Sequence, residues 1–255
     1  MKEFIPTPSV SQFNFGPLTI HFYAVCIILG IFVAITIGKR RSPENSELLN
    51  EIAAYVIPSG ILGARIYHVI TTPEKYFNHN FLDAFKIWEG GLGIWGAIVG
   101  GAVGGYVALM KYGKSDQFLI LADALAPGLL FAQAIGRLGN WFNGELYGKP
   151  TNLPWALRIP GSAQTYHPTF LYEAIWCFVG ALFLLRSERL RKLASGKTFL
   201  LYVLIYTSGR GWIEALRIDN AHRIGGVRLN VWVSALVFAT TLYFYLRKPK
   251  NSKVE

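Results

Sequence analysis

The chain has 255 residues, of which 52% are hydrophobic and 16% are charged, and its mean hydropathy is +0.33. A soluble domain carries about 25% charged residues, so this composition excludes an ordinary soluble protein and favours a membrane protein. The net charge of +10 would suit nucleic-acid binding, but the basic residues stand in short blocks between apolar runs, such as "KRR" at 39–41. We therefore expect the lipid bilayer, and no nucleic acid, as a partner.

Seven apolar runs are long enough, or nearly so, to cross a membrane as helices, because about 20 residues span the hydrocarbon core. Charged residues within the second, fourth and sixth runs make hydropathy a weaker guide there. The long loop after the fourth run holds Trp141, Trp155 and Tyr166, so we expect an ordered extracytoplasmic cap. The sequence predicts an all-α integral membrane protein, one polytopic domain over residues 1–255, with spans near 18–38, 52–71, 92–111, 118–136, 168–186, 198–216 and 229–247 and a cap loop at 137–167.

The orientation follows from the lysines and arginines in the connections between these runs. Alternate connections and termini place 14 of them on one side and 9 on the other, and the richer side is expected to be cytoplasmic. This puts the N-terminus outside and the C-terminus in the cytoplasm. The first run is about span length and its basic block follows it, so we read it as a retained helix rather than a cleaved signal peptide.

With this topology, polar residues from six runs reach one depth near the outer leaflet. A charge in hydrocarbon costs about 3 kcal/mol on insertion scales, so such groups should face the bundle interior and pair with one another. The convergent residues are Tyr23, Arg65, Trp95, Arg137, Asn140, Asn143, Glu145, His167, Tyr172, Glu173, Arg210, Glu214 and Arg217.

The segment "RGWIEALR" has two interpretations. Arg210 and Glu214 are spaced i, i+4, and Glu214 and Arg217 i, i+3, so all three share a helix face. They can form an ion-pair network that joins helices, or they can line a phosphate pocket, because the guanidinium fork binds phosphate at two points. At this depth the phosphate would belong to a phospholipid that enters sideways from the outer leaflet.

Other residues keep a structural alternative beside a functional one. Asn140 and Asn143 can donate to phosphate or glycerol oxygens, or hold a loop turn. Tyr23 can be an interfacial aromatic, and His167 can cap the fifth run. Glu173 needs a partner, and an interhelical hydrogen bond is its expected role. The glycines of "GGLGIWGAIVGGAVGG" predict a face for close helix packing.

Several chemistries find no support in the sequence. Cys26 and Cys177 lie inside apolar runs and form no CxxC pair, so we expect neither a disulfide nor a metal site. The histidines show no metal-ligand spacing, and no serine or cysteine stands in a nucleophile setting. We therefore expect no metal, no cofactor and no covalent enzyme intermediate.

The segment "GRLGNWFNGELYG" resembles the motif of bacterial prolipoprotein diacylglyceryl transferases. "GPLTIHFYAVCIILG", "GILGARIYHVI", "YHPTFLYEA" and "RGWIEALR" are similar to further segments of that family in the same order, so the resemblance covers essentially the whole chain. It implies a multi-pass enzyme of the bacterial cytoplasmic (inner) membrane whose active site faces the outer leaflet. Its reaction, the first step of lipoprotein maturation, moves the diacylglyceryl group of phosphatidylglycerol to the thiol of the lipobox cysteine of a preprolipoprotein and releases glycerol phosphate.

The resemblance also implies site residues. The phosphate would be clamped by Arg137 and Arg210, with Arg65 as a further candidate. The nucleophile arrives on the second substrate, the preprolipoprotein signal peptide, so the enzyme needs no cysteine of its own. Carried over by position, the catalytic candidates are Tyr23, Arg137, Asn140, Glu145 and Arg210, and the candidates for binding phosphatidylglycerol are Arg65, Arg137, Asn143, Gly148, His167, Tyr206, Arg210, Glu214 and Arg217.

One departure from the family pattern concerns the proton of the thiol. Many members carry a histidine where this chain has Trp95, and tryptophan accepts no proton at neutral pH. Either another group is the base, or nearby cations lower the thiol pKa sufficiently. A phospholipid flippase or transporter with the same pocket is the alternative function. It would require a polar path to the inner side of the membrane or internal repeats. The sequence shows no repeat, and Asp123 is the one residue that indicates such a path.

Overall fold

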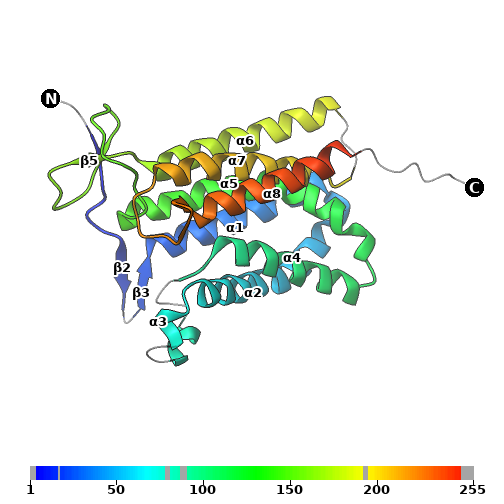
Figure 1. Cartoon of the computed structure of the whole chain (residues 1–255). Helices are drawn as coiled ribbons and strands as arrows, with labels where there is room; N and C mark the ends of the chain where they lie inside the picture. Colours follow the sequence, from blue (N-terminus) through cyan, green and yellow to red (C-terminus); the bar gives the residue numbers. More distant parts are fainter. Residues whose placement is uncertain (1–3, 17, 78–80, 87–90, 192–194, 248–255) are drawn as a thin grey trace, which may run out of the picture. The chain divides into compact units, whose positions relative to one another are not determined.

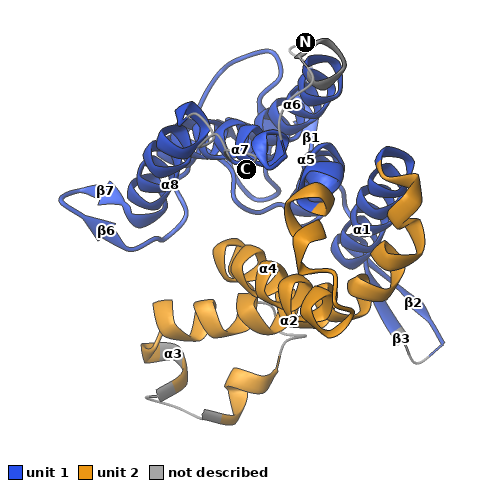
Figure 2. Ribbon diagram, turned by 90° about the vertical axis from the view of Figure 1, so that its right-hand side faces the viewer, with its two compact units in different colours: residues 1–41, 122–255 blue, residues 42–121 orange. Residues whose placement is uncertain are grey.

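A computed structural model describes residues 4–16, 18–77, 81–86, 91–191 and 195–247. Their contacts group the chain into two compact units, residues 1–41 with 122–255 and residues 42–121 (Figure 2). The prediction of one membrane domain over the whole chain stays a prediction, and each unit is described by itself.

The first unit is a set of long helices with small strands at their ends. Within it, α6 and α8 both pack against α7, and Figure 1 shows these three helices side by side with α5. The helices are α1 (Phe22–Arg41), α5 (Phe118–Asn143, whose first turn belongs to the second unit), α6 (Thr169–Arg191), α7 (Lys197–Leu216) and α8 (Leu229–Leu246).

Aromatic and polar contacts join α5 to its neighbours in this unit. Phe131 of α5 meets Phe178 of α6 with 5.3 Å between ring centroids. Gln133 donates a hydrogen bond to the hydroxyl of Tyr202 on α7 at 3.0 Å. Large apolar side chains such as Phe32 and Leu236 remain exposed, as expected of helix faces that contact lipid rather than water.

Side chains from neighbouring helices also satisfy the helix ends. Asp123 of α5 accepts hydrogen bonds from the backbone N–H groups of Gly196 at 2.5 Å and Phe199 at 2.7 Å, so its carboxylate caps the N-terminus of α7. Lys197 donates to carbonyl groups at the C-terminus of α8, including that of Tyr245 at 2.5 Å. Asp123 therefore has a structural role as a helix cap. It was the one residue that had indicated a polar path of the kind that a transporter needs.

Short strands connect the helices of the first unit. β1 (Ile5–Pro6), β4 (Leu157–Arg158) and β5 (Thr165–Tyr166) form a sheet in the order β1-β4-β5, parallel and then antiparallel. β2 (Gln12–Phe15) and β3 (Leu18–His21) form an antiparallel hairpin before α1. β6 (Arg223–Ile224) and β7 (Val227–Arg228) form a second hairpin before α8.

The second unit is built on the pair α2 (Ser46–Thr71) and α4 (Ile94–Lys111). A Cβ on Gly96 would collide with the carbonyl of Gly63, and one on Gly100 with that of Ser59. Glycine thus lets the two backbones touch, which confirms the close-packing face predicted for this segment. Shorter elements are η1 (Pro43–Asn45), α3 (Glu74–Phe77), η2 (Phe81–Phe85) and η4 (Ser115–Gln117).

The described residues contain seven helices of at least 18 residues, at the places where the sequence predicted spans. Six helices of the described chain are long and apolar enough to cross a membrane, and α7 is not one of the six. Arg210 and Glu214 lower its apolarity. Several boundaries differ from the prediction. Residues 18–21 form β3 rather than helix, α2 begins at Ser46, and α6 continues to Arg191. α5 continues to Asn143, so part of the predicted loop is helical.

Candidate active site: a network of arginines and carboxylates

The centre of the site is the carboxylate of Glu173, in the first turns of α6. Its Oε1 lies 2.7 Å from Nη2 of Arg137 on α5, and its Oε2 lies 3.4 Å from Nη1 of Arg210 on α7. Glu173 and Arg210 are almost fully buried, whereas the side chain of Arg137 is 17% exposed. The expectation that Glu173 needs an interhelical partner is confirmed, and one carboxylate holds two guanidinium groups in place.

Arg210 keeps an unused donor. Its Nη2 pairs with Oε2 of Glu214 at 2.8 Å, one turn further along α7. Its Nε is buried and has no hydrogen-bond partner among the described residues. A buried donor without a partner is costly, so this atom marks a place where a ligand oxygen would be stabilising.

Glu214 is the second centre of the network and is fully buried. Besides Arg210, it contacts Nη1 of Arg217 at 3.1 Å and Nε of Arg228 at 2.7 Å. Asn230 donates to the same carboxylate at 3.3 Å. Because both of its oxygens are occupied by cations, Glu214 orients the arginines and is not free to accept a proton.

Asp219 closes the network at its exposed end. Arg217 contacts both of its carboxylate oxygens, at 2.8 and 2.9 Å, and Arg228 contacts one of them at 2.9 Å. Burial raises the pKa of Asp219, but the hydrogen bonds and charges of these two arginines outweigh it and hold the pKa below its ordinary value of 3.8. Asp219 therefore stays ionised at neutral pH.

The loop motif supplies a hydrogen-bonded support for Arg137. Asn140 accepts a hydrogen bond from Nη1 of Arg137 at 3.1 Å and donates to Oε1 of Glu145 at 3.0 Å. Asn143 donates to the same oxygen at 3.0 Å. Both asparagines thus hold the turn at the end of α5, as their structural alternative predicted, and Asn140 also orients the arginine. Glu145 reaches Arg137 only through Asn140.

The turn after α5 has an unusual backbone. Gly144 and Leu146 adopt positive φ angles of 62° and 58°, and for leucine this conformation is strained. The hydroxyl of Thr169 holds it by donating to the carbonyl of Leu146. This fixes the direction of Glu145, which lies between the two.

Gly148 lies where three segments meet. Its N–H donates to the carbonyl of His167 at 2.9 Å, and it pairs with Arg217 as an isolated β-bridge. A Cβ there would lie 2.9 Å from the Cβ of His167, 3.0 Å from the Cγ2 of Thr169 and 3.2 Å from the carbonyl oxygen of Leu216. Only glycine fits, so Gly148 fixes the approach of the loop to the end of α7.

The remaining predicted residues have varied surroundings. His167 shares a hydrogen bond of 3.0 Å with the hydroxyl of Tyr172. Tyr23 is 36% exposed and lies against Gly139, close to the turn that carries Arg137. Tyr206 is buried on α7, one turn before Arg210.

Arg65 and Trp95 lie in the second unit. The guanidinium of Arg65 donates to the backbone carbonyls of Ala84 at 2.7 Å, Asp83 at 2.5 Å and Gly91 at 3.2 Å. It therefore organises the connection between α2 and α4. Trp95 is in the first turn of α4.

Sequence reasoning missed two members of the network. Arg228 and Asp219 lie outside the predicted spans. In the loop that holds them, the basic residues of the sequence served only to assign the orientation. The contact of Arg228 with Glu214 depends on the β6–β7 turn, in which Gly225 and Gly226 both have positive φ angles, whereas Asp219 contacts Arg217 and Arg228. Two glycines at such a position signal a hairpin, but the pairing of β6 with β7 does not by itself place Arg228 beside α7.

These observations define a helical membrane protein whose first unit buries a continuous network of guanidinium and carboxylate groups at one end of α5, α6 and α7. No cluster that could hold a metal ion occurs among the residues described. The family profile described as prolipoprotein diacylglyceryl transferase matches residues 10–247. The chain belongs to this family, and its activity is diacylglyceryl transfer from phosphatidylglycerol to a prolipoprotein.

Similar proteins occur in several bacteria. A phosphatidylglycerol–prolipoprotein diacylglyceryl transferase of Streptomyces griseus is 49% identical over 97% of this chain and 78% of its own. Transferases of the same description from Bifidobacterium adolescentis and Frankia alni are 49% and 50% identical, over 92% and 98% of this chain and 77% and 69% of their own.

Proposed function

We propose that the arginine network binds the phosphate of phosphatidylglycerol and stabilises it as it leaves. The observation that carries this proposal is that Arg137 and Arg210 share the Glu173 carboxylate, while the buried Nε of Arg210 has no partner among the described residues. Arg137 is the more exposed of the two and would meet the phosphate first. Arg217 is bound at both ends by carboxylates, so its role is to hold Glu214 and Gly148 in place.

The charge of the network supports a singly charged ligand. Among the described residues, the guanidinium groups of Arg137, Arg210, Arg217 and Arg228 form direct ion pairs with three carboxylates, those of Glu173, Glu214 and Asp219. The carboxylate of Glu145 is linked to Arg137 only through Asn140. Within the direct ion pairs, one positive charge is therefore uncompensated. The phosphodiester of phosphatidylglycerol carries one negative charge and would neutralise it.

The chemical step is a displacement at carbon. The sulfur of the lipobox cysteine attacks the diacylglyceryl carbon, the C–O bond to phosphate breaks, and its electron pair stays on the phosphate oxygen. Glycerol phosphate leaves, and Arg137 and Arg210 stabilise the charge that develops on it. Arg65, which supports the loop after α2 in the second unit, is a further candidate for binding the lipid.

The proton of the thiol has one candidate acceptor among these carboxylates. Glu173 and Glu214 are bound by arginines, whereas Glu145 contacts only asparagine amides. We assign Glu145 to this role, assisted by the arginines, which favour the thiolate. A Glu145→Gln variant should then recover activity as the pH is raised, because the thiolate forms without a base.

The orientation predicted from basic residues completes the proposal. With the N-terminus outside, the network lies near the outer leaflet of the bacterial cytoplasmic membrane, under a loop at the external face. Phosphatidylglycerol would reach it sideways, and the lipobox cysteine would enter from the outer side. A reporter that fluoresces only in the cytoplasm should be active when fused to the C-terminus.

The test is transfer from phosphatidylglycerol to a lipobox peptide, read as the mass gained by the peptide. Arg137→Ala and Arg210→Ala should each lower the rate by about 100- to 1,000-fold, the usual loss for a group that stabilises a developing anion. Arg223→Ala, on the exposed β6 strand, is the matched control and should be near wild type. Near-native rates in both site variants would disprove the clamp.

A further inference from the structure

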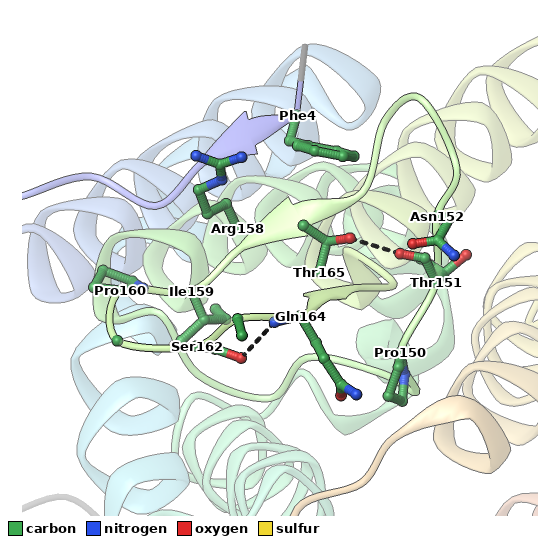
Figure 3. A pocket seen from close by; sticks show the side chains of 12 residues that line it. Phe4, Pro150, Thr151, Asn152, Arg158, Ile159, Pro160, Ser162, Gln164 and Thr165 are labelled. Atoms are coloured by element: carbon green, nitrogen blue, oxygen red, sulfur yellow. Dashed lines mark hydrogen bonds between the residues drawn. The ribbon is translucent and has the colours of Figure 1, made fainter. Parts of the chain in front are cut away.

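A cavity lies outside the arginine network, in the loop between α5 and α6. It has a volume of about 650 Å³ and is enclosed by residues 150–152 on one side and 158–165 on the other, with Phe4 from the N-terminal segment (Figure 3). This is the size of a pocket that binds a small ligand or a few residues of a peptide. Nothing in the mechanism above uses it.

Hydrogen bonds within the loop hold this cavity open. Thr165 donates from its hydroxyl to the carbonyl of Thr151 at 2.7 Å, and the N–H of Gln164 donates to the hydroxyl of Ser162 at 3.1 Å. Ser162 in turn donates its N–H to the carbonyl of Ile159 at 3.1 Å. The walls are therefore fixed by the backbone, and a ligand would not have to order them.

The side chains that face this cavity keep free hydrogen-bonding groups. Asn152 and Gln164 are exposed, and within the described part of the chain neither amide side chain has a hydrogen-bond partner. Each offers one acceptor and two donors. Phe4 and Ile159 add apolar surface to the lining (Figure 3). Amides and small apolar contacts together suit the backbone of an extended peptide.

The charge of the cavity is positive. Among the described residues of its lining, Arg158 is the one charged side chain, and its guanidinium lies 5.4 Å from the ring centroid of Phe4. Phosphatidylglycerol is anchored by its acyl chains in the bilayer, whereas this loop is rich in exposed polar groups. A neutral or acidic polypeptide segment fits this lining better than a basic one.

A ladder of backbone hydrogen bonds connects the cavity to the arginine network. At one end Gly148 pairs with Arg217 and with His167. At the other end Thr151 donates its N–H to the carbonyl of Thr165 at 2.9 Å, and both of these residues line the cavity. From Gly148 to Thr151 an extended chain covers about 10 Å, so one peptide can reach both places.

We propose that this cavity binds the segment of the prolipoprotein that follows the lipobox cysteine. The proposal rests on the function proposed above, which places the cysteine at the arginine network. The ladder then places the cavity about three to five residues after the cysteine, at about 3.3 Å per extended residue. The enzyme recognises this segment by its backbone and its lack of positive charge rather than by particular side chains.

The experiment compares two synthetic peptides with the same signal sequence and lipobox. The short one ends directly after the cysteine, and the long one continues with a neutral tail of serine and asparagine. With wild-type enzyme in phosphatidylglycerol micelles, the long peptide should have a KM about tenfold lower and an unchanged kcat. The double variant Asn152→Ala/Gln164→Ala should raise the KM of the long peptide to that of the short one, whereas Asn220→Ala, an exposed asparagine outside the cavity, should not.

Charge and proximity give two independent readouts. Replacing the serines of the tail with lysine should raise the KM, and Arg158→Glu should reverse this preference, with Arg223→Glu as the control. A photoreactive group placed four residues after the cysteine should cross-link to residues 150–165. Equal KM values for short and long peptides, or cross-links confined to other segments, would overturn the proposal. Near-native transfer to both peptides by Arg137→Ala and Arg210→Ala would instead refute the proposed function.

Discussion

The Glu173→Gln variant tests whether one buried carboxylate holds the two arginines of the clamp. In wild type its oxygens lie 2.7 and 3.4 Å from the guanidinium nitrogens of Arg137 and Arg210, which places the charge centres about 4 Å apart. Each attraction is about 4 kcal/mol at an effective dielectric constant of about 20. Glutamine keeps the shape but removes the counter-charge of Arg137, while Arg210 keeps its ion pair with Glu214.

Breaking such a buried pair usually costs about 3–5 kcal/mol of unfolding free energy, because the remaining charge stays buried. For a chain of this length that lowers Tm by roughly 6–20 °C. Thermal unfolding in detergent, followed by tryptophan fluorescence, measures this directly. Glu51→Gln, at an exposed position on α2, is the control and should shift Tm by no more than about 2 °C.

A double variant separates folding from catalysis. Glu173→Leu with Arg137→Leu removes both charges of one pair, and Arg210 keeps Glu214 as its partner. We expect most of the lost stability to return, because buried ion pairs can be replaced by apolar side chains, while transfer stays lost. The reasoning fails if Glu173→Gln unfolds at the wild-type temperature, or if the double variant regains activity together with stability.

Three further changes probe the frame around the site. Gly148→Ala places a methyl group against the neighbours described above and should cost about 1–3 kcal/mol together with activity, whereas Gly211→Ala, with open space around it, should be tolerated. Asp123→Ala removes the cap of α7 and should lower the unfolding free energy by about 0.5–2 kcal/mol with transfer retained. Folding lowers the pKa of Asp219. Its contribution to the free energy of unfolding is therefore complete above the pKa of the unfolded chain and is lost as the pH falls through the lower pKa of the folded state. Asp219→Asn should therefore flatten the acid end of the Tm profile.

Each of these has a clear contrary result. If Gly148→Ala and Gly211→Ala lower the activity equally, the helix content, and not the close approach of the loop to α7 at Gly148, controls the site. A fully inactive Asp123 variant of wild-type stability would return that residue to a direct role. If the acid profile of Tm is the same with and without Asp219, measured from about pH 6 down to about pH 3, its ion pairs do not stabilise the fold.

The sequence alone predicted the number and places of the long helices, because apolar runs of about span length have few other stable structures in lipid. It also predicted the glycine face of α4, and it selected Arg210 and Glu214 through their position inside an apolar run and Arg137 through its position directly after one. A buried charge costs free energy unless it is paired, so charged residues in or beside apolar runs indicate a structural or functional role.

The tertiary structure decided which of these charges belong together. Glu173 was expected to have a partner, but only the tertiary structure shows that this one carboxylate on α6 contacts an arginine of α5 and an arginine of α7. Arg228 joins the network from the end of the β6–β7 hairpin, and Asp219 joins it from the loop before that hairpin. Arg65 binds carbonyls of its own unit. Spacing along one helix fixes which side chains share a face, whereas ion pairs between helices depend on distances that the order of residues does not contain.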